Sequence, residues 1–219
     1  LPAVGLGVVK QRGANSVAVS KAVKAQIEKI KKTMPEGTTM SVNFDGTKFV
    51  EEAVYELVLT LILAALLTSL VCWLFMGSWS STLNVLMAIP TEVLGSFIVL
   101  YFSGFTLNIF TLLGLSLAIG IVVDDAIMVL ENITRHFEKG LNRRQAAMIG
   151  AREITFAAMA ASVSLVAIFL PIAFMEGIIG AFLYQFGVTM SAAVMISLLE
   201  ALTLTPMRAS QFSRTHTTK

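Results

Sequence analysis

The sequence predicts a mostly α, polytopic membrane bundle of five spans, preceded by a small N-terminal α+β (βαβ) unit. Hydrophobic residues make up 56% of the chain and charged residues 14%, and the mean hydropathy is +0.79, as is typical of polytopic membrane proteins. The charges are also segregated, since no Lys or Arg occurs from Phe49 to Thr134 or from Glu153 to Met207. The net charge of +2 therefore says little about partners, and we expect membrane lipids and no nucleic acid.

Residues 1–50 are predicted to form the βαβ unit. Val4–Lys10 is a short apolar strand, and Thr39–Phe44 is a second strand after a Pro-Glu-Gly turn. Between them, Asn15 or Ser16 caps a helix that runs to about Met34, with apolar residues at helical spacing. Because fifty residues bury little core, we expect the sheet to be completed by sequence outside this chain.

Five spans of about the length needed to cross the hydrocarbon follow in the bundle, residues 51–206. They cover about residues 54–76, 83–102, 106–131, 155–175 and 183–206. The short linkers 77–81, 103–105 and 176–177 make the spans that they join antiparallel neighbours. Residues 207–219 are predicted to be a cytoplasmic C-terminal tail.

The basic residues predict the orientation. The loop between the third and fourth predicted spans and the C-terminal flank are rich in Lys and Arg, whereas the opposite short loops carry almost no charge, so the first set is expected in the cytoplasm. The basic residues are Arg135, Lys139, Arg143, Arg144 and Arg152 in the loop, and Arg208, Arg214 and Lys219 in the flank. The lysine-rich residues 1–50 then lie outside, because long soluble segments translocate largely regardless of charge.

Asp124 and Asp125 stand side by side inside the apolar run Leu112–Leu130. Each carboxylate at that depth costs about 2.5–3.5 kcal/mol on insertion scales. The chain offers no cation at this depth, so the pair either takes up protons or is paired by a helix from outside this chain. Both interpretations predict a proton relay in a proton-coupled transporter, with protons as the coupling ion and no cofactor.

Small residues share the faces of these acids. Ser116, Gly120 and Asp124 lie four apart on one stripe, and Gly114, Ala118 and Asp125 form an adjoining one. Small side chains let a second helix approach closely, so we expect helix packing at these positions. Packing alone does not explain two adjacent acids.

Three further acids are candidate accessory groups. Glu131 continues the first stripe toward the cytoplasm, and Glu92 and Glu200 lie at membrane depth after Pro90 and before Pro206. For Glu92 and Glu200, the plainer interpretation is a protonated or water-solvated side chain facing the bundle interior. For Glu131, a functional role and helix packing alone both stay open.

Neither a metal site nor an enzyme is predicted. His136 and His216 have no ligand-spaced partner, and the Met residues are scattered without paired spacing. Intramembrane aspartyl proteases place two Asp on facing helices, whereas neighbours on one helix diverge by about 100° around it. Asp124 and Asp125 therefore do not form a protease dyad.

The segment Leu117–Asn132 resembles the fourth-helix signature of resistance-nodulation-division (RND) efflux transporters. Further similarities to that family follow its order: Phe44–Val50 to the entry of the second helix, Phe169–Phe174 to the fifth, and Leu202–Pro206 to the end of the sixth. The resemblance runs to about residue 212, and the adjacent aspartates are similar to those of the hydrophobe/amphiphile (multidrug) branch.

The resemblance implies a fragment of the first half of an inner-membrane, proton-driven, trimeric exporter of amphiphilic compounds. Asp124 and Asp125 would be its proton relay, and the missing second half would supply a lysine to them. Residues 1–50 would belong to a periplasmic porter subdomain. A periplasmic adaptor and an outer-membrane channel would be partners of the full-length homotrimer.

Two alternatives to a multidrug exporter remain. The chain lacks a starting Met and a partner cation, which favours a non-transporting membrane remnant. A related proton-driven lipid exporter or secretion accessory would share the same signature. Substrate pockets of such exporters lie mostly in periplasmic segments outside this chain.

Overall fold

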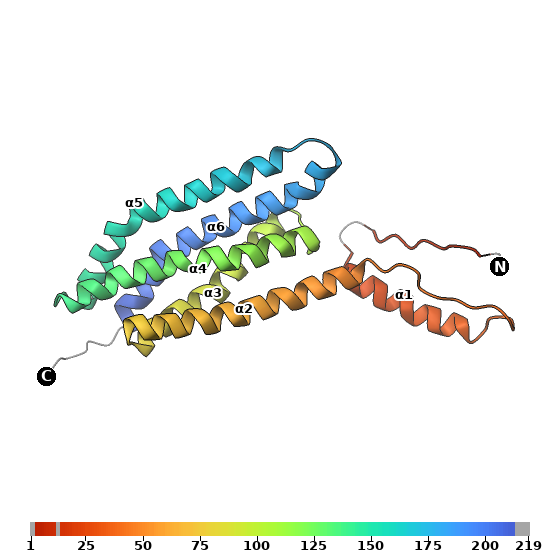
Figure 1. The fold of residues 1–219 in the computed structure, drawn as a ribbon, viewed down its shortest axis with the longest axis horizontal. Coiled ribbons are helices and arrows are strands. Elements are labelled where there is room, and N and C mark those ends of the chain that lie inside the picture. Colours follow the sequence, from red (N-terminus) through yellow and green to blue (C-terminus); the bar gives the residue numbers. More distant parts are fainter. Residues whose placement is uncertain (1–2, 12–13, 213–219) are drawn as a thin grey trace. The chain divides into compact units, whose positions relative to one another are not determined.

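A computed structural model describes residues 3–11 and 14–212. The chain divides into two units between Val54 and Tyr55. The elements follow one another as α1 (Ser16–Lys31), α2 (Thr47–Met76), α3 (Trp79–Phe102), α4 (Ile109–Glu138), α5 (Arg143–Phe169), the 3₁₀ helix η1 (Leu170–Phe174) and α6 (Gly177–Phe212) (Figure 1).

The first unit contains α1, which confirms the predicted helix. Asn15 is its N-cap, and the Asn15 side chain accepts a hydrogen bond from the Ala18 N–H at 3.0 Å. Asp45 anchors the segment after the helix, because its carboxylate lies 2.5 Å from the Lys24 ammonium on α1. Lys24 first, and then hydrogen bonds from Thr47, hold the pKa of Asp45 well below its usual range.

The two predicted strands of the βαβ unit are wrong. Val4–Lys10 and Thr39–Phe44 are irregular, and no strand occurs in the described residues 3–11 and 14–212. A strand is stable only when a neighbouring strand takes up its backbone hydrogen bonds. No backbone hydrogen bond pairs these two segments, and the apolar side chains of the first stay exposed, as Val4 and Val9 do at 91% each.

The five predicted spans are confirmed. Each of α2, α3, α4, the α5–η1 segment and α6 is long and apolar enough to cross a membrane. The helices extend past the predicted spans, most of all at α5, which begins at Arg143, and at α6. Helix α6 continues through residues 207–212 of the predicted tail, and the remaining tail residues, with Arg214, His216 and Lys219, lie outside the described part.

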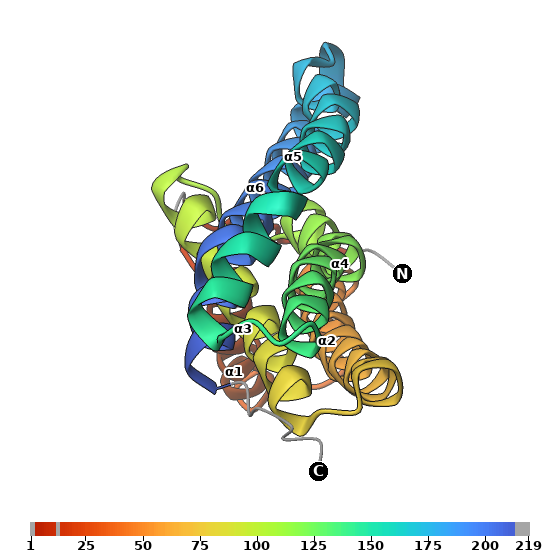
Figure 2. The ribbon, with the colours of Figure 1, turned by 90° about the vertical axis from the view of Figure 1, so that its left-hand side faces the viewer.

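Helix α6 is the centre of the bundle, since it packs against α3, α4 and α5. Figures 1 and 2 show α5 and α6 side by side and joined at η1, where Pro171 follows the end of α5. Glycine brings α4 and α5 into close contact, because a Cβ on Gly150 would lie 2.8 Å from the Ile133 Cα. These contacts bring α4, α5 and α6 together in one bundle.

Candidate functional site

Asp125 lies where three helices meet. It projects from α4, and its Oδ2 accepts hydrogen bonds from the Ser162 hydroxyl of α5 at 3.3 Å and the Ser197 hydroxyl of α6 at 3.4 Å. Ser162 and Ser197 are fully buried, whereas Asp125 is half-buried. The charge state of this carboxyl therefore bears on the contact between α4 and both of its neighbours.

Asp124 has the opposite environment. Its side chain is exposed, and no hydrogen bond or ion pair joins it to the described part of the chain. The stripe to which it belongs is open as well, because Gly120 is exposed and a Cβ there would meet nothing within 4 Å. Ser116, one turn further, is half-buried. This face is free to receive a helix from outside the chain, or lipid.

The adjoining stripe packs inside the bundle. A Cβ on Gly114 would lie 3.2 Å from Thr189 of α6, and Ala118 is buried in a cluster with Met190 and Val194. The small residues predicted for helix packing thus divide into an inner stripe that contacts α6 and an outer stripe whose Gly120 is exposed.

Glu92 and Asp125 both accept a hydrogen bond from the hydroxyl of the same serine, Ser197. Glu92 is 3% exposed on α3, and its Oε1 accepts a hydrogen bond from the Ser197 hydroxyl at 3.2 Å. One hydroxyl of α6 therefore contacts a carboxylate of α3 and a carboxylate of α4. Ser162 and Ser197 were not predicted from the sequence, because they stand in apolar runs like many other serines.

Glu200 is not a free acid. It forms a buried ion pair with Arg208, and its Oε2 accepts a hydrogen bond from Thr205 at 2.9 Å. Arg208 was expected on the cytoplasmic flank, but it is 7% exposed, and its Nε donates to Asn84 Oδ1 of α3 at 2.8 Å. Helical side chains lean toward the N-terminus of their helix, so Arg208 reaches back along α6 to the acid.

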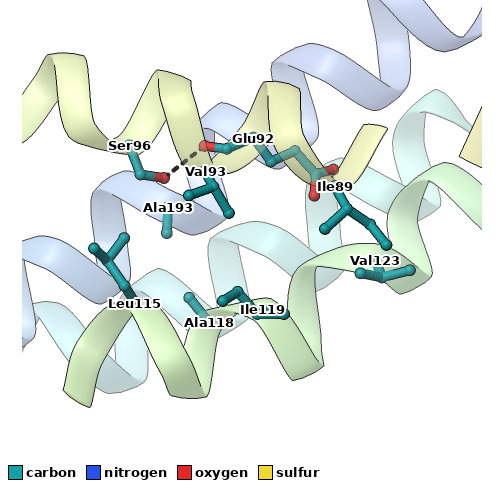
Figure 3. A pocket seen from close by; sticks show the side chains of 9 residues that line it. All are labelled: Ile89, Glu92, Val93, Ser96, Leu115, Ala118, Ile119, Val123 and Ala193. Atoms are coloured by element: carbon teal, nitrogen blue, oxygen red, sulfur yellow. Dashed lines mark hydrogen bonds between the residues drawn. The ribbon is translucent and has the colours of Figure 1, made fainter. Parts of the chain in front are cut away.

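A small void adjoins Glu92 between α3, α4 and α6. Its volume is about 10 Å³, which is room for one water molecule and far below the size of a pocket for a drug-sized ligand. Figure 3 shows its lining, and the dashed line there joins the Ser96 hydroxyl to the Glu92 backbone carbonyl. The lining residues are Ile89, Glu92, Val93, Ser96, Leu115, Ala118, Ile119, Val123 and Ala193.

The remaining polar candidates lie toward the basic loop. Glu131 is exposed on α4 and makes no ion pair within the described residues. His136 Nε2 lies 2.9 Å from Glu153 Oε2, and Asn132 donates to the same oxygen at 3.1 Å, so these groups connect α4 to α5. Within residues 3–11 and 14–212 no group of three or more His, Cys, Asp or Glu side chains could hold a metal ion.

Known proteins are similar to this chain over nearly all of its length. A profile of the AcrB/AcrD/AcrF family matches residues 1–219. Multidrug resistance protein MdtC of Photorhabdus laumondii is 37% identical over 218 residues, which are 100% of this chain and 21% of that protein. MdtC of Yersinia enterocolitica is 38% identical over 217 residues, 99% of the chain and 21% of that protein.

A third relative, MdtC of Escherichia coli O139:H28, is 40% identical over 206 residues, 94% of this chain and 20% of that protein. The chain therefore spans about a fifth of the length of these relatives.

Proposed function

The chain belongs to the AcrB/AcrD/AcrF family, and from that premise we propose that it is the proton-relay segment of a proton-driven exporter of amphiphilic compounds. The resemblance to RND multidrug transporters is confirmed by the family match and by the relatives. With five long apolar helices, the chain is a multi-pass segment of the inner membrane. Proton antiport, the substrates and the partners belong to the proposal, since the chain spans a fifth of its relatives.

The observation that carries the proposal is the difference in environment between the two aspartates. Asp125 is held inside by hydroxyls from α5 and α6, whereas Asp124 is exposed and has no described partner. A proton gained or lost on this pair changes the internal contacts of α4 and, through Asp124, its contact with any helix docked on the outer stripe. A charge change at the boundary of two packed surfaces is the usual basis of a two-state switch.

A cation from another part of the complete protein completes the relay. Two adjacent carboxylates at membrane depth repel each other, and Asp124 lies on the face that is open to such a cation. The lysine that RND transporters bring from their second half fits this position. Protonation would release the lysine, and deprotonation would restore the pair.

Transport is also favoured over enzymatic chemistry. The side chains of Asp124 and Asp125 point to different environments, one to the bundle interior and one outward, so they do not share a proton as the dyad of an aspartyl protease does. The relatives carry the name multidrug resistance protein, which favours a multidrug exporter over a lipid exporter or a secretion accessory.

The complete exporter would act as a homotrimer in the inner membrane, with a periplasmic adaptor and an outer-membrane channel. Residues 1–50 would lie in the periplasm, and the basic loop that includes Arg143 and Arg144 in the cytoplasm. Membrane lipids would cover the exposed apolar side chains of α2, for example Leu66 and Leu67.

Drug efflux from cells tests the proposal. In the complete transporter, Asp124→Asn and Asp125→Asn keep the side-chain shape and remove the titratable charge, so each should abolish efflux while the protein still inserts. Arg152→Gln removes an exposed charge outside the relay and is the matched control. Wild-type efflux by either Asn variant would rule out the relay.

A further inference from the structure

We propose that Glu92 is a further proton-carrying residue of the transporter, connected to Asp125 through the hydroxyl of Ser197. The inference rests on the proposed function, because it gives the relay a second carboxyl on another helix. Glu92 lies on α3, whereas the two adjacent aspartates lie on α4.

The position of Glu92 is unusual for an acid. It is 3% exposed at membrane depth, and it forms no ion pair within the described residues. Ionisable residues inside membrane helices are expensive to bury and are commonly found on ion or proton pathways. Glu200 differs in this respect, because Arg208 neutralises it. Glu92 is thus the buried acid of the α3–α6 contact that no cation holds in one charge state.

Ser197 bridges the two carboxyls at nearly equal distances. Its Oγ lies 3.2 Å from Glu92 Oε1 and 3.4 Å from Asp125 Oδ2, both longer than the usual O–H···O distance of about 2.7–2.8 Å. A hydroxyl carries one proton and can donate it to only one of these oxygens at a time. Both contacts are hydrogen bonds when one carboxyl holds a proton and donates it to the serine oxygen.

This arrangement can pass a proton without moving a helix. A protonated Asp125 donates its proton to Ser197 Oγ, while the Ser197 proton moves to Glu92 Oε1. Asp125 is left as a carboxylate, Glu92 becomes a neutral acid, and Ser197 is again a hydroxyl. One proton has moved from α4 to α3, and rotation of the serine O–H bond resets the path.

Among the charged groups near Glu92, Asp125 is the partner for proton transfer. Helix α3 packs against α4 and α6, and the charged groups that these helices bring near Glu92 are Asp125 from α4 and Glu200 and Arg208 from α6. Glu200 and Arg208 are bound to each other, and Arg208 is further bound to Asn84. Asp125 is therefore the group of this set that is free to exchange a proton with Glu92.

A small void lies next to Glu92. Its volume is about 10 Å³, which is room for one water molecule beside the buried side chain. Figure 3 shows the carboxyl group of Glu92 beside Ile89.

Infrared difference spectroscopy tests the link in the complete transporter, reconstituted in lipid, between high and low pH. Glu92→Gln should remove one pH-dependent band of a protonated carboxyl group. The midpoint of that band should shift by about 1 pH unit in Ser197→Ala and in Asp125→Asn, as interacting titrations do. Ser96→Ala is the matched control, because Ser96 is a buried serine that bonds the backbone carbonyl of Glu92 and not its carboxyl group.

Proton-driven export in proteoliposomes gives the second readout. Glu92→Gln and Ser197→Ala should slow export at least about tenfold with a changed pH profile, and Glu92→Asp should restore part of the rate. Substrate affinity should stay unchanged.

Two outcomes would overturn the inference while the relay stands: export by Glu92→Gln at the wild-type rate and pH profile, or a Glu92 band that Asp125→Asn leaves in place. Either then assigns Glu92 to packing. If Asp125→Asn itself exports normally, the proposed function is wrong, and the inference falls with it.

Discussion

The buried ion pair of α6 provides the sharpest prediction about stability. Glu200→Gln keeps the shape of the side chain and leaves the Arg208 guanidinium without a counter-charge in a site where it is 7% exposed. A guanidinium cannot shed its proton in a protein. Arg208→Met is the milder change, because the remaining carboxyl group can be neutralised by a proton.

The expected size follows from burial. Removal of one partner from a buried ion pair destabilises by about 3–5 kcal/mol. The Asn84 and Thr205 side chains still bind Arg208 in Glu200→Gln, so the lower value of about 3 kcal/mol applies. Replacement of both partners, Glu200→Leu with Arg208→Met, should recover most of the loss, since apolar pairs of similar volume are often neutral to stability.

The labelling rate of Cys72 can measure the stability of the helix packing near this ion pair. Cys72 is the single cysteine of the chain, 2% exposed, and it belongs to the same hydrophobic cluster as Ala201 and Ala209, the residues that follow Glu200 and Arg208 on α6. In a complete transporter without other cysteines, its labelling rate measures how often the cluster opens. A loss of 3 kcal/mol should make labelling about 100-fold faster in Glu200→Gln, since each 1.4 kcal/mol is a factor of ten.

Arg152→Met is the matched control, because it removes an exposed positive charge from the same bundle and should leave the rate unchanged. If Glu200→Gln labels at the wild-type rate, or if Arg208→Met labels faster than Glu200→Gln, the reasoning about a buried, charge-neutralised pair is refuted.

Three further predictions concern other parts of the chain. Lys24 holds the pKa of Asp45 below its unfolded value of about 3.9, so the stabilising contribution of this ion pair is complete above about pH 3.9 and is lost as the pH falls further. The acid-unfolding curve of the first unit should therefore change in Asp45→Asn, and an unchanged curve would contradict the contact. Gly150→Leu should push α5 away from α4 and lower stability by about 1–3 kcal/mol in thermal unfolding, whereas a wild-type melting temperature would show that the two helices separate freely. Asn142→Cys should be labelled only from the cytoplasm and Thr38→Cys only from outside, and labelling of Asn142→Cys by an impermeant reagent in intact cells would reverse the topology.

Helices were predictable because their signals are local. Each span is a long, predominantly apolar run, and the start of α1 is marked by Asn15, whose side chain caps the first turn. The aspartate pair was predictable for the same reason, since two acids inside an apolar run stand out without any knowledge of the fold.

Strands and tertiary partners were not predictable because they depend on distant residues. Val4–Lys10 has the composition of a strand, but nothing in the described chain pairs with it. Serines in membrane helices usually bond the carbonyl four residues earlier, as Ser164 and Ser191 do, and no local feature separates Ser162 or Ser197 from them.

The partners of Arg208 were not predictable for a related reason. A basic residue near the end of a span normally marks the cytoplasmic side, and the rule ignores what lies across the helix contact. Burial of Arg208 needs Glu200 two turns earlier on α6 and Asn84 on α3, which is 124 positions away in sequence. The pairing becomes visible only when the two helices are packed together.

Proton flux through the reconstituted complete transporter tests the central claim most directly. With a pH gradient imposed across the liposome membrane, addition of an amphiphilic substrate should start a proton flux that is absent in Asp124→Asn and in Asp125→Asn and present in Arg152→Gln. Substrate-dependent proton flux of wild-type size in either aspartate variant would contradict the account.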